Sequence, residues 1–270
     1  MRKKYGLLGK NINYSFSPQL HKEIFNFLKC SYNYNIFDLE ENEIENLIKK
    51  IKEDEIQGIN ITIPYKQTVM RYLDEISENA QKIGAVNTVY KKDNKLIGEN
   101  TDYYGFLKTI ESMKLNLKNK NVAVLGSGGS AKAVVQVIKN LGGKIFLVSR
   151  TPQNVDSHFT DMEIIDYEKL KNISGKLIVN CTPLGGKNYS EISPIDEETA
   201  EKWECAVELN YTPEFSPFLL YFKNNNKKYM NGFYMLVAQG IESENIWQNK
   251  NIPVDAIYNK VYNNVYKKFD

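Results

Sequence analysis

The chain has 270 residues, 42% of them hydrophobic and 12% aromatic, which is enough apolar material for one large domain or two ordinary ones and excludes global disorder. Lys and Arg number 35 against 33 Asp and Glu, so the formal net charge of +2 argues against nucleic acids and anionic membranes as partners. No apolar run approaches the roughly 18–20 residues of a membrane span, and we expect a cytoplasmic protein. The three cysteines and two histidines are scattered, which argues against a disulfide framework or a structural metal site.

The first half of the sequence alternates between strand-like and helical patterns. Ser17 can cap a helix that has a proline in its first turn, and residues 44–51 carry apolar side chains at helical spacing. In residues 58–64, isoleucines alternate with Asn60 and Thr62, which predicts a strand with three isoleucines on one face and polar side chains on the other. Further strands are expected at residues 5–9, 86–90 and 96–99, the last two as a hairpin.

The second half continues this alternation, which predicts an α/β fold with parallel sheets covered by helices. A new unit begins near residue 121, and the chain from residue 232 onward carries two long helical patterns with no strand after them. We expect those helices to pack on the first unit or to bridge both. Strands are expected at residues 121–126, 144–149, 176–181 and 205–209, and helices at residues 130–141, 234–248 and 254–268.

A glycine-rich segment follows the strand that ends at Leu125. It reads G-S-G-G-S-A over residues 126–131 and leads into a helix, which fits the G-x-G-x-x-A pattern of dinucleotide-binding sites in its strand-turn-helix setting. Gly126 permits the tight turn, Gly128 lets a pyrophosphate approach the backbone, and Ala131 allows close packing of helix on strand. The alternative is a tight turn without a ligand.

The next strand ends in Ser149, Arg150 and Thr151, where an NAD site usually offers a carboxylate to the ribose. No carboxylate stands here, and a guanidinium can pair a 2′-phosphate through two parallel hydrogen bonds. The segment therefore predicts NADP rather than NAD. The alternative is an ordinary exposed arginine.

Short polar clusters stand at the ends of the strands in the first half, where ligand sites of α/β proteins commonly lie. Asn60, Thr62 and Lys66 form one cluster, and Asn87 and Asp102 belong to two others. Each residue also has a structural interpretation: Lys66 as a solvated lysine, Asn87 as a turn residue, and Asp102 as the cap of a helix over residues 104–113.

These motifs and several others stand in an order that resembles the shikimate dehydrogenase family over nearly the whole chain, and such an order is hard to obtain by chance. In the first half the matching segments are S-F-S-P at 15–18, N-I-T-I-P-Y-K at 60–66, G-A-V-N-T at 84–88 and N-T-D at 100–102. In the second half they are G-S-G-G-S-A at 126–131, S-R-T at 149–151, N-C-T-P-L-G at 180–185, Y-T-P at 211–213 and N-G-F-Y-M-L-V-A-Q at 231–239.

The resemblance implies a two-domain oxidoreductase that reversibly reduces 3-dehydroshikimate to shikimate with NADPH, a step of chorismate and aromatic amino-acid biosynthesis. An N-terminal α/β substrate-binding and catalytic domain, residues 1–101, would be completed by the C-terminal helices of residues 232–270. Residues 102–231 would form a Rossmann-type NADP-binding domain, and the active site would lie between the two.

The resemblance also assigns roles by motif position. Lys66 would be the acid/base, Asp102 would hold its ammonium group and hydrogen-bond the reacting oxygen, and Ser15 and Ser17 would hold the substrate carboxylate. The substrate-binding residues implied are Ser15, Ser17, Asn60, Thr62, Lys66, Asn87, Asp102, Tyr211 and Gln239. The cofactor-binding residues implied are Gly126, Ser127, Gly128, Gly129, Ser130, Ala131, Ser149, Arg150, Thr151, Asn180, Thr182, Leu209, Gly232 and Met235. No metal ligand is implied.

Two rival hypotheses share the motifs. The chain could be a quinate/shikimate dehydrogenase that uses NAD, because the preference for ring substituents cannot be read from the sequence and Ser149, where the family has Asn, weakens the expected adenosine contacts. It could also be a catalytically silent ligand-binding homologue, although a binding protein has no need of both Lys66 and Asp102. The sequence leaves the oligomeric state open, with a homodimer as one alternative.

Overall fold

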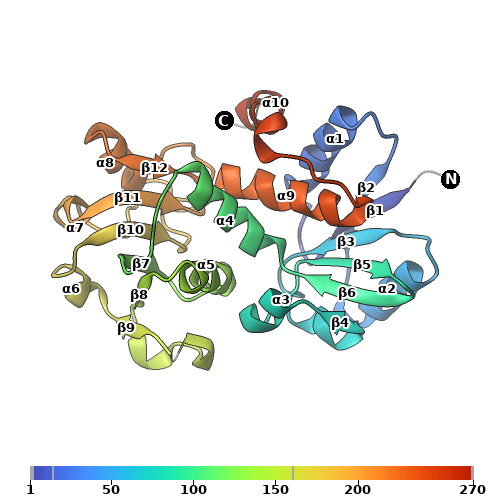
Figure 1. Ribbon diagram of the computed structural model, residues 1–270, viewed down its shortest axis with the longest axis horizontal. Helices are drawn as coiled ribbons and strands as arrows, with labels where there is room; N and C mark the ends of the chain where they lie inside the picture. The colour runs from blue at the N-terminus through green and yellow to red at the C-terminus, as the bar shows by residue number, and fades with distance from the viewer. Residues whose placement is uncertain (1–2, 14, 160, 269–270) are drawn as a thin grey trace. The chain divides into compact units, whose positions relative to one another are not determined.

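The structure, a computed structural model, describes residues 3–13, 15–159 and 161–268. The chain divides into two compact units. Unit 1 comprises Met1–Gly105 and Val237–Phe269, and unit 2 comprises Phe106–Leu236. Each crossing falls inside a helix, α4 (Thr101–Ser112) and α9 (Gly232–Gln248). The α/β class with parallel sheets is confirmed, since the described strands form two sheets of six (Figure 1).

Unit 1 is built on a mixed sheet with the strand order β2-β1-β3-β5-β6-β4. Its strands are β1 (Lys4–Gly9), β2 (Asn33–Asp38), β3 (Gly58–Ile61), β4 (Glu75–Ile76), β5 (Thr88–Lys92) and β6 (Lys95–Glu99). β1 runs parallel to β2 and β3, whereas β5 is antiparallel to β3 and β6. The predicted hairpin is confirmed at β5 and β6, whose turn residues Asp93 and Asn94 both have positive φ.

The helices of unit 1 bury apolar stripes against this sheet. Ile44, Leu47, Ile48 and Ile51 of α2 are all buried and belong to one core cluster with residues of β1, β3, β5 and β6, as the helical spacing predicts. α10 lies beside α1 (Figure 1). The helices are α1 (Ser17–Phe27), η1 (Glu41–Glu43), α2 (Ile44–Lys52), η2 (Thr68–Tyr72), α3 (Glu78–Ile83), η5 (Val254–Ala256), α10 (Tyr258–Asn264) and η6 (Tyr266–Lys268).

Three local expectations in unit 1 are wrong. The strand predicted over residues 58–64 ends at Ile61, and Ile63 is 60% exposed because the chain has already turned away from the sheet. Ser17 does not cap α1, since the N-cap position belongs to Phe16 and Ser17 is the first helical residue. The helix predicted over residues 254–268 is divided into η5, α10 and η6.

Unit 2 is a parallel sheet with the strand order β12-β11-β10-β7-β8-β9. Counted from β7, this is the doubly wound order 3-2-1-4-5-6, in which ligands bind outside the carboxyl ends of the strands where the order reverses, here at β7 and β10. The strands are β7 (Asn121–Leu125), β8 (Lys144–Val148), β9 (Glu163–Ile165), β10 (Gly175–Asn180), β11 (Trp203–Glu208) and β12 (Lys228–Met230). The helices are α5 (Gly129–Asn140), η3 (Pro152–Asn154), η4 (Ser157–Phe159), α6 (Tyr167–Leu170), α7 (Glu197–Glu201) and α8 (Pro217–Asn224).

The central strand of unit 2 reads as a continuous apolar run because both of its faces are covered. The side chains from Val122 to Leu125 are fully buried, and α5 buries a continuous run of side chains, residues 131–138.

Within the described ranges, no helix combines the length and the apolar character that a membrane span needs.

Candidate active site

Lys66 and Asp102 form an ion pair in unit 1, with 2.6 Å between Nζ and Oδ2. Their side chains remain 27% and 18% exposed, so both groups reach solvent. Among the described residues Lys66 has no other side-chain partner, and an ammonium group carries three donors, so two N–H groups remain for a ligand. The pair therefore joins a proton donor to a carboxylate that orients it.

The turn after β3 fixes the backbone of Lys66. Its carbonyl oxygen accepts a hydrogen bond from the Val86 N–H at 2.8 Å, and the main-chain N–H of Tyr65 donates to the Thr62 carbonyl at 2.9 Å. The early end of β3 is what brings Lys66 into this turn rather than onto a continuing strand.

Asp102 lies in the first turn of α4, two residues after the residue that caps the helix. The cap is Asn100, whose side-chain oxygen accepts from the Tyr103 N–H at 3.2 Å and whose amide nitrogen donates to the Ala85 carbonyl at 2.9 Å. The interpretation of Asp102 as the cap is thus wrong, and the helix begins at residue 101 rather than 104. The Asp102 carboxylate is left to pair with Lys66.

Asn87 is buried, and its contacts fix the orientation of its side-chain amide. Its Oδ1 accepts from the Thr101 N–H at 2.7 Å and lies 3.2 Å from the Thr101 hydroxyl. A backbone N–H can only donate, so this contact fixes the Asn87 oxygen toward α4 and turns the NH2 group away. No described residue accepts from that NH2 group, which is therefore available to a ligand.

Asn60 lies in a cluster of buried hydroxyl groups. Its Nδ2 donates to the Thr88 hydroxyl at 2.9 Å and to the Ser243 hydroxyl at 2.8 Å, and Ser243 in turn donates to the Gln239 carbonyl at 3.0 Å. The Gln239 side-chain oxygen lies 3.5 Å from the Thr101 hydroxyl. Sequence reasoning missed Thr88, Thr101 and Ser243, although the first two lie inside the motifs and Ser243 follows Gln239 by one helical turn.

Three half-buried hydroxyl side chains complete the predicted residues of unit 1. The Ser15 and Ser17 hydroxyls lie 3.2 Å apart, and the Ser17 N–H donates to the Ser15 hydroxyl at 3.2 Å. The main-chain N–H of Thr62 bonds to the Leu8 carbonyl, while its hydroxyl makes no hydrogen bond to a described residue. Eight of the nine residues predicted to bind substrate lie in unit 1, and Tyr211 belongs to unit 2.

In unit 2 the glycine-rich loop fits an anion. Gly126 has a φ of +92°, and a Cβ at Gly128 or Gly129 would meet nothing within 4 Å, so the chain leaves open space beside both glycines. α5 begins there without a side-chain cap, hence its first N–H groups face that space. Ser127 is half-buried, Ser130 is exposed, and Ala131 is buried against the sheet.

Arg150 follows β8 and extends into solvent. No described residue accepts a hydrogen bond from its guanidinium group, whereas its neighbours are held locally, with the Thr151 N–H donating to the Ser149 hydroxyl at 3.2 Å. The chemistry of an unpaired guanidinium beside a glycine-rich loop fits the 2′-phosphate of NADP.

Asn180 and Thr182 serve the loop after β10. The Asn180 amide donates to Glu208 Oε1 at 2.7 Å and to the Leu184 carbonyl at 2.8 Å, and its oxygen accepts from the Thr182 hydroxyl at 2.7 Å. Burial raises the pKa of the Glu208 carboxyl, and hydrogen bonds from Ser216 and the neighbouring amides oppose the shift. Both predicted residues thus support the loop from within.

Gly232 begins α9 at a place that admits no side chain, because a Cβ there would collide with the Leu209 carbonyl oxygen. Its N–H donates to the Asn210 carbonyl at 3.0 Å. Leu209 and Met235, the other predicted cofactor residues of this region, are half-buried and buried. Tyr211 packs its ring edge-on to Phe233, with 6.5 Å between the centroids.

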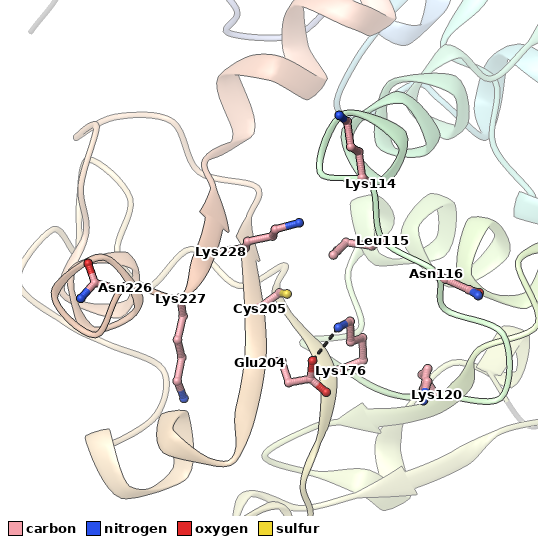
Figure 2. Close-up of a pocket in the computed structure, with 10 residues that line it drawn as sticks. All are labelled: Lys114, Leu115, Asn116, Lys120, Lys176, Glu204, Cys205, Asn226, Lys227 and Lys228. Atoms are coloured by element: carbon pink, nitrogen blue, oxygen red, sulfur yellow. Dashed lines mark hydrogen bonds and ion pairs between the residues drawn. The ribbon is translucent and has the colours of Figure 1, made fainter.

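A hollow of about 630 Å³ in unit 2 lies at the amino ends of β10, β11 and β12 (Figure 2). Residues 126–131 follow the carboxyl end of β7 and thus lie at the opposite edge of the sheet. In the hollow, Lys176 pairs with Glu204 at 2.5 Å, Lys227 donates to main-chain carbonyls, and Lys228 donates to the Met113 carbonyl at 3.2 Å. These lysines tie strands and helix ends together, so we do not assign them to the candidate site.

Among the described residues, no cluster of three His, Cys, Asp or Glu side chains could hold a metal ion.

Comparison with known proteins decides the family. The family model described as the shikimate dehydrogenase substrate binding domain matches residues 7–89. The shikimate dehydrogenase (NADP(+)) of Clostridium beijerinckii is 40% identical over 268 residues, which cover 98% of this chain and 97% of that protein. The chain belongs to the shikimate dehydrogenase family.

Solved structures of shikimate dehydrogenases share the fold over their whole length. A chorismate mutase/shikimate 5-dehydrogenase fusion protein from Clostridium acetobutylicum has a TM-score of 0.92 and 37% identity, with 99% of each chain covered. The shikimate 5-dehydrogenase of Thermus thermophilus in complex with NADP(H) and shikimate has a TM-score of 0.83 and 30% identity, covering 94% of this chain and 96% of that one.

Proposed function

We propose that the chain catalyses the reversible, NADPH-dependent reduction of 3-dehydroshikimate to shikimate. The observation that carries the proposal is the ion pair of Lys66 and Asp102, a partly exposed proton donor held beside a carboxylate on the unit that matches the substrate-binding family model. Membership in the shikimate dehydrogenase family supports the reaction and the cofactor. All the residues that the proposal uses belong to a single chain, so the proposal does not depend on a homodimer.

We infer that unit 1 binds shikimate through its donors and acceptors. The Asn87 NH2 group can only donate, so it would hold a ring hydroxyl by its oxygen. The Ser15 and Ser17 hydroxyls, close together at the start of α1, would hold the carboxylate. Thr62, Asn60, Gln239 and Tyr211 would be the remaining residues that contact the ring.

We infer that unit 2 binds NADP(H), with the pyrophosphate at residues 126–131 and the 2′-phosphate at Ser149, Arg150 and Thr151. Asn180, Thr182, Leu209, Gly232 and Met235 would shape the rest of that site, the first two by holding the loop after β10. The nicotinamide, when bound, supplies or accepts the hydride.

Proton transfer falls to Lys66 in this proposal. In the reduction, a Lys66 N–H would give its proton to the ring oxygen as negative charge develops there, and the amine would regain a proton from water. Asp102 would keep the amine directed at that oxygen and stabilise the ammonium form. In the oxidation the same amine would take the proton away.

Steady-state oxidation of shikimate and quinate, each with NADP+ and with NAD+, tests the function. The shikimate and NADP+ combination should give the highest kcat/KM, and treatment with a chelator should leave the rate unchanged. Comparable use of quinate and NAD+ would instead favour the quinate/shikimate dehydrogenase hypothesis. Tight shikimate binding without turnover would favour a silent binding homologue.

A further inference from the structure

We infer that Tyr34 is a positioning residue of the proposed shikimate site and acts through Asn60. The inference rests on the proposed function for its ligand, and on the hydrogen bonds of unit 1 for its geometry. Tyr34 lies on β2 and Asn60 on β3, the two strands that flank β1. The Tyr34 hydroxyl reaches across β1 and donates to Asn60 Oδ1 at 2.8 Å.

The contacts of Asn60 leave its amide only one orientation. The Asn87 carbonyl oxygen, which can only accept, lies 3.3 Å from Asn60 Nδ2, so the NH2 group must face that side. Its two hydrogens go to the Thr88 and Ser243 hydroxyls at 2.9 and 2.8 Å. Asn60 Oδ1 therefore faces β2, where Tyr34 is the described residue that donates to it.

From Asn60 the order of donors continues to the proposed ligand groups. Ser243 gives its proton to the Gln239 carbonyl, so its oxygen accepts from Asn60. The Thr88 hydroxyl, which also accepts from Asn60, has its one proton left for the Ser243 hydroxyl at 3.1 Å or for Asn87 Oδ1 at 3.2 Å. The Thr101 N–H donates to the same Asn87 oxygen at 2.7 Å, and the Thr101 hydroxyl lies 3.2 Å from it, so these donors hold the Asn87 NH2 group toward the ligand.

Tyr34 can keep this role because its ring is locked and its proton is retained. The ring stacks on His21 of α1 with 4.0 Å between centroids and 10° between planes. His21 is itself fixed by a fully buried contact of its Nδ1 with Glu244 Oε1 at 2.6 Å. Burial and the Glu244 carboxylate raise the pKa of the Tyr34 phenol well above its ordinary value, against the opposing effect of a hydrogen bond from Ser17, so it stays a donor.

Removal of the Tyr34 hydroxyl would leave Asn60 Oδ1 buried without a donor. A buried polar atom that loses its partner bears its full desolvation cost, and the amide can lower that cost only by turning. A turned amide would point NH2 at β2 and oxygen at Thr88 and Ser243, so both hydroxyls would have to donate to Asn60. Thr88 would then withdraw its proton from Asn87 Oδ1 and Ser243, and Ser243 would withdraw its proton from the Gln239 carbonyl. The effect should therefore fall on shikimate binding and leave the cofactor site of unit 2 unchanged.

Tyr34→Phe tests this inference, because it deletes one hydroxyl and keeps the ring on His21. We expect the shikimate dissociation constant, measured by calorimetry on the free enzyme, to rise about tenfold, the size of one good hydrogen bond. The NADP+ dissociation constant should stay within about twofold. Tyr65→Phe is the matched control, since its phenol also donates a 2.8 Å bond in unit 1, to the Leu39 carbonyl, outside the network; its shikimate affinity should equal that of the wild type.

A double-mutant cycle separates positioning from general loosening. If Tyr34 acts through Asn60, adding Tyr34→Phe to Asn60→Ala should weaken shikimate binding no further. Additive losses, an unchanged dissociation constant in Tyr34→Phe, or an equal loss in Tyr65→Phe would each overturn the inference. A wild-type enzyme that neither binds nor oxidises shikimate would overturn the proposed function as well, so the two failures are distinguishable.

Discussion

At the scale of single residues, Lys66 separates chemistry from binding. Lys66→Ala should lower kcat about 10²- to 10⁴-fold, the usual contribution of a positioned acid/base, while the shikimate dissociation constant changes by no more than several-fold. Binding should persist because Ser15, Ser17 and Asn87 retain their donors. The measurement pairs kcat with a directly determined dissociation constant, since KM alone mixes binding with later steps.

Lys91→Ala is the control for this substitution. Lys91 also pairs with an aspartate in unit 1, Asp54, with 2.8 Å between Nζ and Oδ2, and plays no part in the proposed site. It should keep wild-type turnover. If Lys66→Ala keeps near wild-type turnover at every pH from mildly acidic to alkaline, Lys66 is only a surface charge. Another residue must then act as the acid/base.

His158 makes a residue-scale contribution to the pH dependence of stability. Burial, and then the nearby Lys132, lower the pKa of the His158 imidazole below its ordinary value of 6.5. The unfolded chain therefore binds a proton more readily than the folded chain, so this contribution is complete above pH 6.5 and is lost as the pH falls through the folded pKa. His158→Gln should remove this part of the acid destabilisation.

Thermal unfolding of the wild type and His158→Gln between about pH 5 and 7.5 measures that contribution. The difference in Tm between the two proteins should change with pH, with the wild type losing more as the solution becomes acidic. A difference in Tm that is constant over this range would show that His158 titrates alike in the folded and unfolded chains.

At the scale of elements, two glycines at helix starts should respond differently to an added methyl group. Gly128 is the N-cap of α5, with φ −77° and open space around its Cβ position, so Gly128→Ala is sterically free. The unfolded-chain entropy that alanine removes, about 0.4–1 kcal/mol, opposes the poorer capping by alanine, so stability should change little. That space is where we propose the pyrophosphate lies, so NADP+ affinity should fall. Urea unfolding and an NADP+ titration measure the two effects separately.

Gly232→Ala provides the contrast, because its Cβ would collide with a main-chain oxygen that cannot turn away. Overpacking of this kind typically costs about 1–3 kcal/mol, so the variant should unfold at lower urea concentration. If Gly128→Ala keeps full NADP+ affinity, the loop is a tight turn without a cofactor role.

The accuracy of sequence reasoning differed among the elements for physical reasons. The helix at Ile44–Lys52 and the strand at Asn121–Leu125 were predictable because burial alone decides their patterns. The end of β3 was not, since the alternation of isoleucines continues to Ile63 while the chain turns away. Local patterns likewise miss the Asn100 cap and the breaks after residue 254, which depend on contacts with distant segments.

In the candidate site, the sequence motifs were sufficient to locate the charged pair and the glycine-rich loop. The supporting hydroxyl side chains could be identified only from the folded structure. Lys66 and Asp102 are 36 residues apart in the chain and meet only because their segments flank the same part of the unit 1 sheet. Ser243 is 183 residues from Asn60, and no local pattern reports such a contact. Side chains that hold other side chains carry a weaker sequence signal than side chains that carry the chemistry.

At the scale of the whole molecule, the two compact units are joined through helices rather than loops. The boundaries fall inside α4 and α9, and each helix continues across its boundary without interruption. Unfolding one unit alone would end both helices in their interiors and break the hydrogen bonds that span the boundary. We therefore expect the units to unfold together.

Calorimetric unfolding with NADP+ tests this coupling. A cofactor present at a hundred times its dissociation constant stabilises the folded chain by about 2.7 kcal/mol, which raises Tm by several degrees in a chain of this size. Because unit 2 alone supplies the proposed cofactor residues, a single transition that moves as a whole would show that unit 1 gains the same stability. Arg150→Ala lacks the proposed contact with the 2′-phosphate. Its Tm should therefore rise much less than that of the wild type at the same NADP+ concentration, and by as much as NAD+ raises the Tm of the wild type. Two transitions, of which NADP+ moves only one, would mean that the helices break at the boundary and the units melt independently.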